Sequence, residues 1–418
     1  MLQLTKENIT AYLKEKMPSM DFSKPLDIYM VGEGTLEEDG DGFINFIYKV
    51  SDGKTKLVLK QGGVHGRVGK TKDFDLPLNR GKLEYDSMKI RGAIVPQYVP
   101  KLYFYDDENC VMAVEDVSRL KIMRFQLNKN IIYPGFATKI AEFMAKSHFY
   151  TSEYYLSTEM FRDLTVHFMN HKMRNVMDDI LFISTADQDQ DFGVIIEPEF
   201  VPFVKKLVLD PQVVEARYEL KRKYITNGET FVHADLHTSN IMLDEKEMKV
   251  IDMEYTFCGP FASDLGYLES NFLSQYICAT YRPFESEEKR AEFKQWCLIT
   301  MRDIFEEYCR IFFDCFEKDA KKQYRGVPGL KENIKKQLLS DVIGFTATAS
   351  FNRACGFSTL IEYNELGKGR ERMEALCSTM IFDRTSLLRR DTYRTAQEWV
   401  DELASIEDLF RTFRAAEI

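Results

Sequence analysis

The sequence contains no uninterrupted apolar run of the roughly 20 residues that a membrane-spanning helix requires. It also has no excess of positive charge, since 56 Lys and Arg stand against 66 Asp and Glu. That balance excludes the basic footprint of a nucleic-acid-binding or polybasic membrane-binding protein. None of the eight cysteines forms a CxxC pair, and the first residues contain no apolar signal core. We therefore expect no nucleic-acid partner, no membrane contact, a cytoplasmic location and reduced thiols.

The chain is long enough to form two domains. Its 418 residues exceed the size, about 250 to 300 residues, at which a single hydrophobic core stops growing. Hydrophobic residues make up 44% and charged residues 29%, which is the composition of a folded globular protein. We expect two lobes.

The N-terminal part reads as a small β-rich lobe. Residues 5–17 carry apolar residues at helical spacing, and after them the period changes to two. The pattern predicts a helix over 78–93 and five strands, within 26–34, 42–50, 55–61, 101–107 and 110–117. We predict a nucleotide-binding lobe over 1–115.

The remainder, residues 116–418, is predicted to be a larger and mainly helical lobe with the catalytic loop and acceptor site. Two short β-type runs, IML and KVID, interrupt it after a loop dense in polar residues. The fold class is therefore α+β, with a small antiparallel sheet in the first lobe and helices in the second.

The strongest chemical motif is HADLHTSN, which contains Asp235 and Asn240 and is followed by Asp252 after a predicted hairpin. Kinases use an Asp, an Asn five positions later and a further Asp to place a base and two Mg²⁺ ligands around one γ-phosphate. Mg²⁺ accepts a carboxylate and an amide oxygen and completes its shell with substrate phosphates. The alternative is a polar surface loop, which does not account for several independent constraints.

Two further acidic residues follow Asp252. Glu254 is two positions later, so in extended backbone both carboxylates point to one side. Glu254 is either a metal ligand or a structural acceptor, and the sequence leaves both open. Asp264, in PFASDLG, is expected to tie the catalytic loop to the start of a helix.

In the first lobe, the turn GDGFINFIYKV is a candidate phosphate cover, because glycines let backbone N–H groups approach phosphate oxygens. Lys60 ends the run LVLK, where a strand-borne lysine would reach the phosphates, and Glu84 on the next helix would hold it. The alternatives are an ordinary turn, a solvated edge lysine and an exposed helix carboxylate.

With these residues placed, the sequence resembles the S-methyl-5-thioribose kinases, a branch of the group that holds the choline kinases and aminoglycoside phosphotransferases. The resemblance extends from LTKENITAYL to EDLFRTF. EFMAKSHFYTSEYYL and IDMEYTFCGP are specific to that branch, whereas HxDxxxxN is shared by the whole group.

The resemblance implies a bilobal protein-kinase-like fold, ATP and Mg²⁺, a sugar acceptor and a homodimer. It implies phosphorylation of methylthioribose at the anomeric hydroxyl in methionine salvage. The resemblance also implies a role for each site residue. ATP would be contacted by Asn45, Lys60, the hinge residues Glu115, Asp116 and Val117, and by Asp252 and Glu254. The metal would be bound by Asn240, Asp252 and Glu254, and the substrate by the catalytic base Asp235 and by Arg353. A guanidinium suits a vicinal diol, although an arginine at 353 also reads as a salt-bridge partner.

Departures from the branch concern the acceptor side. Ala234 stands where the branch typically has Gly, and Ser239-Asn240 where it has Gly-Ser. The paired arginines appear as Asn352-Arg353. The tryptophan loop is replaced by KTKDFDLP, with Phe74 as its one aromatic residue.

Two rival functions remain at this point. A kinase for choline, an amino alcohol or an aminoglycoside would have an acidic site that meets a cation. A catalytically inactive kinase-like binding module tends to have lost one of the catalytic residues, yet Lys60, Asp235, Asn240 and Asp252 are all present.

Overall fold

The computed structural model describes residues 1–40, 44–63, 76–187, 189–356 and 360–413, which pack as two compact units. Unit 1 comprises Met1–Phe125, Asn170–Met173 and Thr238–Thr256, and unit 2 comprises Gln126–Met169, Arg174–His237 and Phe257–Ile418. The segment that carries Asn240 and Asp252 thus packs with the N-terminal residues. The predicted boundary between the two lobes, after Glu115, stays a prediction, because the packing of the two units does not show which part of the chain folds independently.

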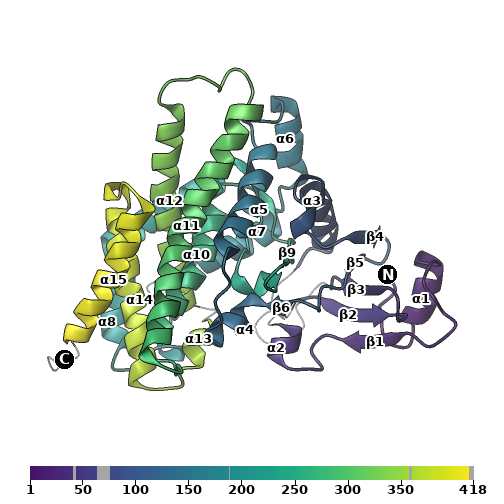
Figure 1. The fold of residues 1–418 in the computed structure, drawn as a ribbon, viewed down its shortest axis with the longest axis horizontal. Coiled ribbons are helices and arrows are strands. Elements are labelled where there is room, and N and C mark those ends of the chain that lie inside the picture. The colour runs from purple at the N-terminus through teal and green to yellow at the C-terminus, as the bar shows by residue number, and fades with distance from the viewer. Residues whose placement is uncertain (41–43, 64–75, 188, 357–359, 414–418) are drawn as a thin grey trace. The chain divides into compact units, whose positions relative to one another are not determined.

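Unit 1 is built on a five-stranded antiparallel sheet in the order β1-β2-β3-β5-β4 (Figure 1). This confirms the five strands that the period of two predicts. The strands are β1 (Asp27–Met30), β2 (Phe46–Ser51), β3 (Lys56–Gln61), β4 (Leu102–Asp106) and β5 (Val111–Glu115). Alternate residues of β3, Leu57 and Leu59, are buried, as expected for a strand with one face on a core.

Helices and a second sheet complete unit 1. Helix α1 (Ile9–Lys16) buries Ile9 and Leu13 in one core with residues of β2 and β3, which confirms the predicted first helix. The other elements are α2 (Leu36–Asp39), α3 (Arg80–Ile94), a 3-10 turn Pro96–Tyr98, β6 (Lys121–Ile122), α4 (Met123–Asn128, which continues into unit 2), a 3-10 turn Thr238–Asn240, β8 (Ile241–Leu243) and β9 (Met248–Val250). The patterns did not predict α2, a single turn at whose start the Thr35 N–H donates to the Glu38 carboxylate at 3.1 Å.

Unit 2 is mainly helical, as the apolar spacing predicts. Its helices are α5 (Phe136–Tyr150), α6 (Thr158–His167), α7 (His171–Asp178), α8 (Val201–Val208), α9 (Pro211–Thr226), α10 (Phe261–Cys278), α11 (Glu287–Asp319), α12 (Leu330–Cys355), α13 (Ile361–Asn364), α14 (Arg370–Arg389) and α15 (Ala396–Phe413), with α7 starting in unit 1. Shorter elements are a π-helical turn Asp179–Ile183, 3-10 turns Phe192–Val194 and Arg390–Thr392, and the antiparallel pair β7 (Thr230–Val232) and β10 (Phe257–Gly259).

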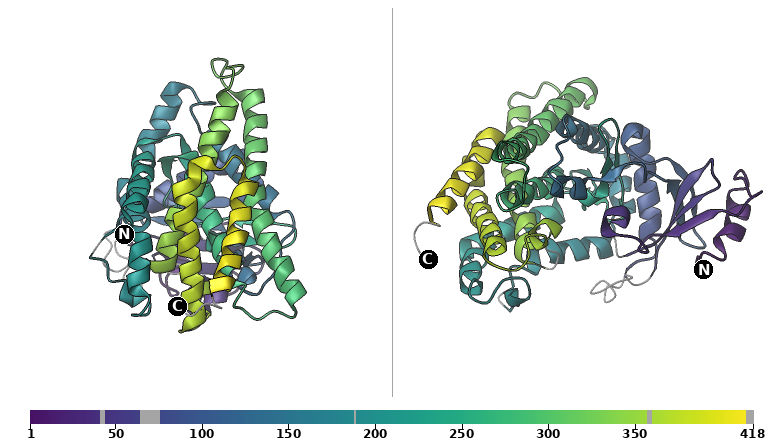
Figure 2. Two further views of the ribbon diagram at one scale, coloured as in Figure 1. Left: turned by 90° about the vertical axis from the view of Figure 1, so that its left-hand side faces the viewer. Right: turned by 60° about the horizontal axis from the view of Figure 1, so that its bottom comes forward.

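Helices α10, α12 and α14 lie side by side and form the centre of unit 2 (Figures 1 and 2). Every residue of α10 is buried, which requires close approach of its neighbours. At Gly266 a Cβ atom would lie 2.6 Å from the Phe345 Cβ and 2.7 Å from the backbone nitrogen of Thr346, so α12 passes directly over this position. Glycine therefore sets the spacing of α10 and α12.

Seven of the eight cysteines are buried, Cys110 is half-buried, and all eight are unpaired. This agrees with the expectation of core thiols. No helix in the described ranges is both long and apolar enough to cross a membrane.

Gly266→Ala should destabilise the protein by about 1–3 kcal/mol, because the added methyl meets backbone atoms that cannot move without separating two helices. Gly92 on α3 is the matched control, since a Cβ there meets nothing within 4 Å. Gly92→Ala should stabilise by about 0.4–1 kcal/mol through the lower entropy of the unfolded chain. Equal midpoints of denaturant unfolding for the two variants would contradict the close helix packing.

Candidate active site

Lys60 lies on β3 between β2 and β5, and its side chain is held by two carboxylates. The Lys60 Nζ donates to Glu84 Oε1 at 2.9 Å and also contacts Asp252. The predicted Lys60–Glu84 pair is confirmed, and the alternative of a solvated edge lysine is wrong, because the side chain is 12% exposed. Burial acts to lower the pKa of Lys60, but Asp252 and Glu84 hold that pKa above its ordinary value, so the ammonium stays charged.

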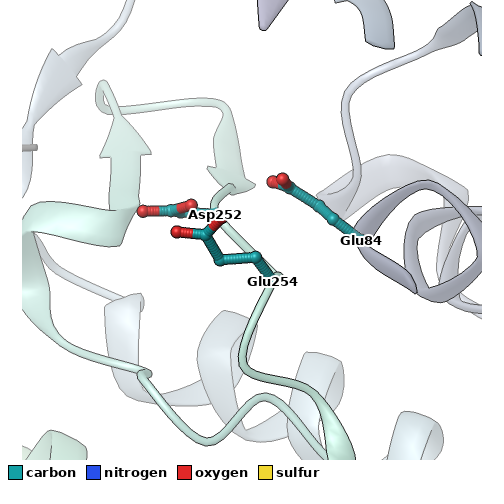
Figure 3. A group of neighbouring side chains, drawn as sticks. All are labelled: Glu84, Asp252 and Glu254. Carbon is teal, nitrogen blue, oxygen red and sulfur yellow. The ribbon is translucent and has the colours of Figure 1, made fainter. Parts of the chain in front are cut away.

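Three carboxylates lie close together (Figure 3), and two of them contact the Lys60 side chain. Glu84 comes from α3, and Asp252 and Glu254 come from the segment after β9; one oxygen of each lies within 4.8 Å of the others. Hard oxygen ligands at this spacing are the donor set that Mg²⁺ prefers, so these residues fit the metal that the resemblance implies. Asp252 has φ of 64°, a left-handed conformation that is uncommon outside glycine and tends to occur at functional sites.

Glu254 is buried and accepts two hydrogen bonds within unit 1. Asn45 Nδ2 donates to its Oε2 at 3.0 Å, and Arg80 Nε donates to the same oxygen at 3.2 Å. Arg80 Nη2 also donates to Asn45 Oδ1 at 2.8 Å, which closes a triangle of polar contacts. Glu254 is thus a structural acceptor, while its place among the three carboxylates also keeps the metal role open.

The sequence analysis missed Arg80, although its side chain is completely buried in this triangle. Arg80 lies in the first turn of α3, and no sequence motif marks an arginine at that position as functional. Its partners are 35 and 174 residues away along the chain, so local spacing gave no signal.

Asn240 is buried at the end of the 3-10 turn that precedes β8. Its backbone carbonyl accepts the N–H of Ile251 at 3.0 Å, the residue before Asp252. The β8–β9 hairpin therefore fixes the two predicted metal ligands relative to each other through the main chain.

The predicted hinge residues follow the end of β5. Glu115 is the last residue of that strand, and the Asp116 N–H donates to the carbonyl of Lys56 on β3 at 3.3 Å. Val117 is buried. The predicted phosphate-cover turn includes residues 41–43, and Phe74 lies in 64–75; both stretches are outside the described residues.

In unit 2 the structure brings Asp235 and Arg353 into one neighbourhood. His237 Nε2 lies 3.5 Å from Asp235 Oδ2, and the Arg353 Nη2 donates to the hydroxyl of Tyr267 at 2.6 Å. Burial acts to raise the pKa of Asp235, but His237 first, and then Arg353 and His233, hold it below its ordinary value. Asp235 is therefore an ionised carboxylate at neutral pH.

Tyr267 and His237 are functional candidates that the sequence analysis did not select. Their rings lie 6.2 Å apart, and the Arg353 guanidinium carbon lies 5.1 Å from the Tyr267 ring centre. Tyr267 also lines a small, mostly apolar cavity together with Ala234 and Phe345. One indication of Tyr267 was present in the sequence, because this residue comes three positions after Asp264, which was already expected to contact the catalytic loop.

Ala234, the departure from the branch's glycine, has φ of 68°. Glycine adopts this left-handed conformation without strain, which gives a physical reason for the glycine that the resemblance leads us to expect there. The conformation lets the N–H groups of His233 and Ala234 both donate to the Asp264 carboxylate, at 2.7 and 2.8 Å. The expected tie between the catalytic loop and a helix start is confirmed.

Arg80→Leu should destabilise the protein by about 3–5 kcal/mol, because it leaves the Glu254 carboxylate buried without its cation. Arg119, whose side chain is 47% exposed and paired with Glu247, offers the matched control. Arg119→Leu should cost below about 1 kcal/mol, as exposed ion pairs do. Urea unfolding of both variants measures the difference, and similar losses in the two would contradict the buried role of Arg80.

Comparison with known proteins gives one family model that matches part of the chain and relatives that align over most of it. Residues 207–295 match the family model described as "Phosphotransferase enzyme family". The chain is 29% identical over 373 residues to a methylthioribose kinase from Geobacillus sp. (strain WCH70), covering 88% of this chain and 90% of the relative. It is 29% identical over 383 residues to the methylthioribose kinase of Geobacillus thermodenitrificans (strain NG80-2), covering 90% of each.

Among solved structures, a choline kinase from Cryptosporidium parvum Iowa II aligns over 95% of this chain and 99% of its own, with 13% identity and a TM-score of 0.49. The conclusion about relationship rests on the sequence relatives and not on the solved structures. The resemblance predicted from the motifs is confirmed, and this chain is related in sequence to the methylthioribose kinases over nearly nine-tenths of its length.

Proposed function

We propose that the protein is a kinase that transfers the γ-phosphoryl group of ATP to S-methyl-5-thio-D-ribose, giving S-methyl-5-thio-α-D-ribose 1-phosphate in methionine salvage. The observation that carries the proposal is the sequence similarity to methylthioribose kinases, which extends over 88% of this chain. As the resemblance suggests, the enzyme acts as a cytoplasmic homodimer.

In this proposal, unit 1 holds the nucleotide and the metal. Lys60 and Asn45 bind phosphate oxygens, and the main chain of Glu115, Asp116 and Val117 meets adenine. Asn240, Asp252 and Glu254 would hold Mg²⁺. The metal, when bound, neutralises charge that develops on the phosphoryl oxygens.

Unit 2 supplies the base and the acceptor contacts. The ionised Asp235 accepts or orients the proton of the anomeric hydroxyl, and His237 beside it restrains the carboxylate. Phosphoryl transfer has a loose transition state, so positioning of the hydroxyl matters more than its deprotonation. Arg353, held against Tyr267, donates to hydroxyls of the sugar.

The charge near Asp235 favours a neutral polyol over a cationic acceptor. Arg353 acts on Asp235 as a cation and is almost fully buried, so a choline or aminoglycoside ammonium would meet a like charge. An inactive binding module is not favoured either, because Lys60 keeps its carboxylate partners.

The function is tested by ADP release from Mg·ATP with four acceptors: methylthioribose, choline, ethanolamine and an aminoglycoside. Turnover with methylthioribose should exceed that with each of the others by at least about a hundredfold in kcat/KM, since a site built for hydroxyls rejects analogues that leave its polar groups unpaired. Turnover with choline and none with methylthioribose would leave only the general kinase assignment.

Asp235→Asn should lower kcat by about 10²–10⁴-fold, because the amide keeps the shape but cannot accept the proton. Nucleotide affinity should stay near that of the wild type, because the proposed ATP contacts belong to unit 1. Steady-state kinetics and nucleotide titration measure the two quantities. A loss of kcat below about fivefold would remove Asp235 from the role of base.

Arg353→Ala should raise KM for methylthioribose at least about tenfold, since hydrogen bonds to substrate hydroxyls are lost. KM for ATP should be almost unchanged. Tyr267→Phe is the control that keeps the guanidinium and removes only the hydroxyl that holds it, and its effect on KM should be smaller. A larger rise for Tyr267→Phe than for Arg353→Ala would place the sugar contact elsewhere.

A further inference from the structure

The connection between β1 and β2 contains Asp39, the last residue of α2, to which the proposed function gives no role. Its side chain is 4% exposed. The Tyr29 hydroxyl donates to Asp39 Oδ2 at 2.7 Å. The N–H groups of Gly32 and Gly34 donate to the same oxygen, at 2.7 and 3.0 Å. One carboxylate oxygen therefore fixes the backbone that follows β1.

The second oxygen of Asp39 lies near Lys49 of β2. Lys49 Nζ is 3.7 Å from Asp39 Oδ1 and donates to the Glu38 carbonyl of α2 at 3.3 Å. The same ammonium lies 5.5 Å from the centre of the Tyr29 ring. These contacts tie α2 to both strands that flank it in the chain. We call the residues that make them the Asp39 cluster: Tyr29, Gly32, Gly34, Asp39 and Lys49.

The Asp39 carboxylate is ionised in this environment. Burial acts to raise the pKa of Asp39, but the hydrogen bond from Tyr29, the two main-chain N–H groups and the charge of Lys49 hold that pKa below its ordinary value. An ionised carboxylate only accepts hydrogen bonds, so it suits a site where each neighbour is a donor. Hydrogen bonds to a charged group are also stronger than those between neutral groups.

The far end of α2 reaches β6 within unit 1 (Figure 1). Gly40 follows α2 with φ of 78°, and a Cβ atom there would lie 3.4 Å from Ile122 Cδ1 of β6. Strand β6 pairs with β8, which begins directly after Asn240. Residues 31–40 therefore extend from the sheet that carries Lys60 to the strand pair beside Asn240. The proposed function places Mg·ATP between these two groups.

We propose that Asp39 is a positioning residue for the nucleotide, which keeps residues 31–40 in place as one wall of the Mg·ATP site. The identity of the nucleotide rests on the proposed function. At the other end of the same connection, Asn45 donates to Glu254 of the candidate metal site at 3.0 Å. Backbone that is already ordered before the ligand arrives lowers the entropy cost of binding. Loss of the Asp39 carboxylate should therefore weaken nucleotide binding without removing a nucleotide contact.

The β2–β3 turn offers a matched control on the same sheet. Asp52 there also accepts three main-chain N–H groups, those of Asp21, Lys54 and Thr55, at 2.6 to 2.8 Å. Because β2 pairs antiparallel with both β1 and β3, this turn and the β1–β2 connection lie at opposite ends of β2. A role of Asp39 in the stability of the sheet alone predicts similar effects of the two aspartates on nucleotide binding.

The first experiment measures the Kd of the non-hydrolysable analogue AMP-PNP with Mg²⁺ by titration calorimetry. Asp39→Ala should raise this Kd at least about tenfold, because only molecules with the connection in place bind at full affinity. Asp39→Asn keeps one acceptor oxygen and should recover part of the loss. Asp52→Ala should leave the Kd within about twofold of the wild type, because it alters the other end of β2.

The second experiment does not depend on turnover or on calorimetry. Hydrogen exchange of residues 31–40, followed by mass spectrometry in the ligand-free protein, should be faster in Asp39→Ala than in Asp52→Ala, because two amides lose their acceptor. Saturating AMP-PNP with Mg²⁺ should slow exchange of the same segment in the wild type. Should Asp39→Ala not fold, Tyr29→Phe replaces it, since it removes one donor from the carboxylate, and it should also speed this exchange.

Equal rises in Kd for Asp39→Ala and Asp52→Ala would overturn the proposal, as would a Kd of Asp39→Ala within about twofold of the wild type. Exchange of residues 31–40 that does not respond to saturating AMP-PNP would also overturn it. A wild type that binds AMP-PNP but does not phosphorylate methylthioribose would count against the proposed function alone, since the binding and exchange results still decide the role of Asp39.

Discussion

The close approach of three carboxylates is the constraint around which the candidate site is organised. Glu84, Asp252 and Glu254 have oxygens within 4.8 Å of one another, and like charges at that distance repel unless cations offset them. Lys60 offsets the first two and Arg80 the third. The same arrangement that stabilises unit 1 without a ligand leaves an oxygen-rich site suited to a divalent metal. The stability of unit 1 and the proposed metal binding therefore depend on the same side chains.

In unit 2 a buried carboxylate is stabilised by main-chain and histidine donors. The buried Asp264 carboxylate is met by two main-chain N–H groups and by His148, so its charge is stabilised without a lysine or arginine. Asp235 lies one residue beyond this anchor and has His237 beside it. A hydrogen-bonded main chain next to an ionised carboxylate suits the role of base that we propose for Asp235.

The sequence predicted what short-range patterns encode. The strands of unit 1 follow from a period of two, and Lys60 with Glu84 follows from a motif with known spacing. Arg80 and Tyr267 were missed as site residues, because their roles come from contacts between elements far apart in the chain. The departure at Ala234 was visible in the sequence, but its meaning required the backbone angle. Asn352, where the resemblance leads us to expect an arginine, is completely buried, so an arginine would not fit there without rearrangement.

The central claim is that the anomeric hydroxyl of methylthioribose receives the phosphoryl group. The most direct measurement is NMR of the product formed from methylthioribose and Mg·ATP. The account predicts a single phosphate ester whose phosphorus is coupled to the anomeric proton, in the α configuration. Phosphorus coupled to a proton at C2 or C3, or no phosphorylated sugar while another acceptor is consumed, would contradict it.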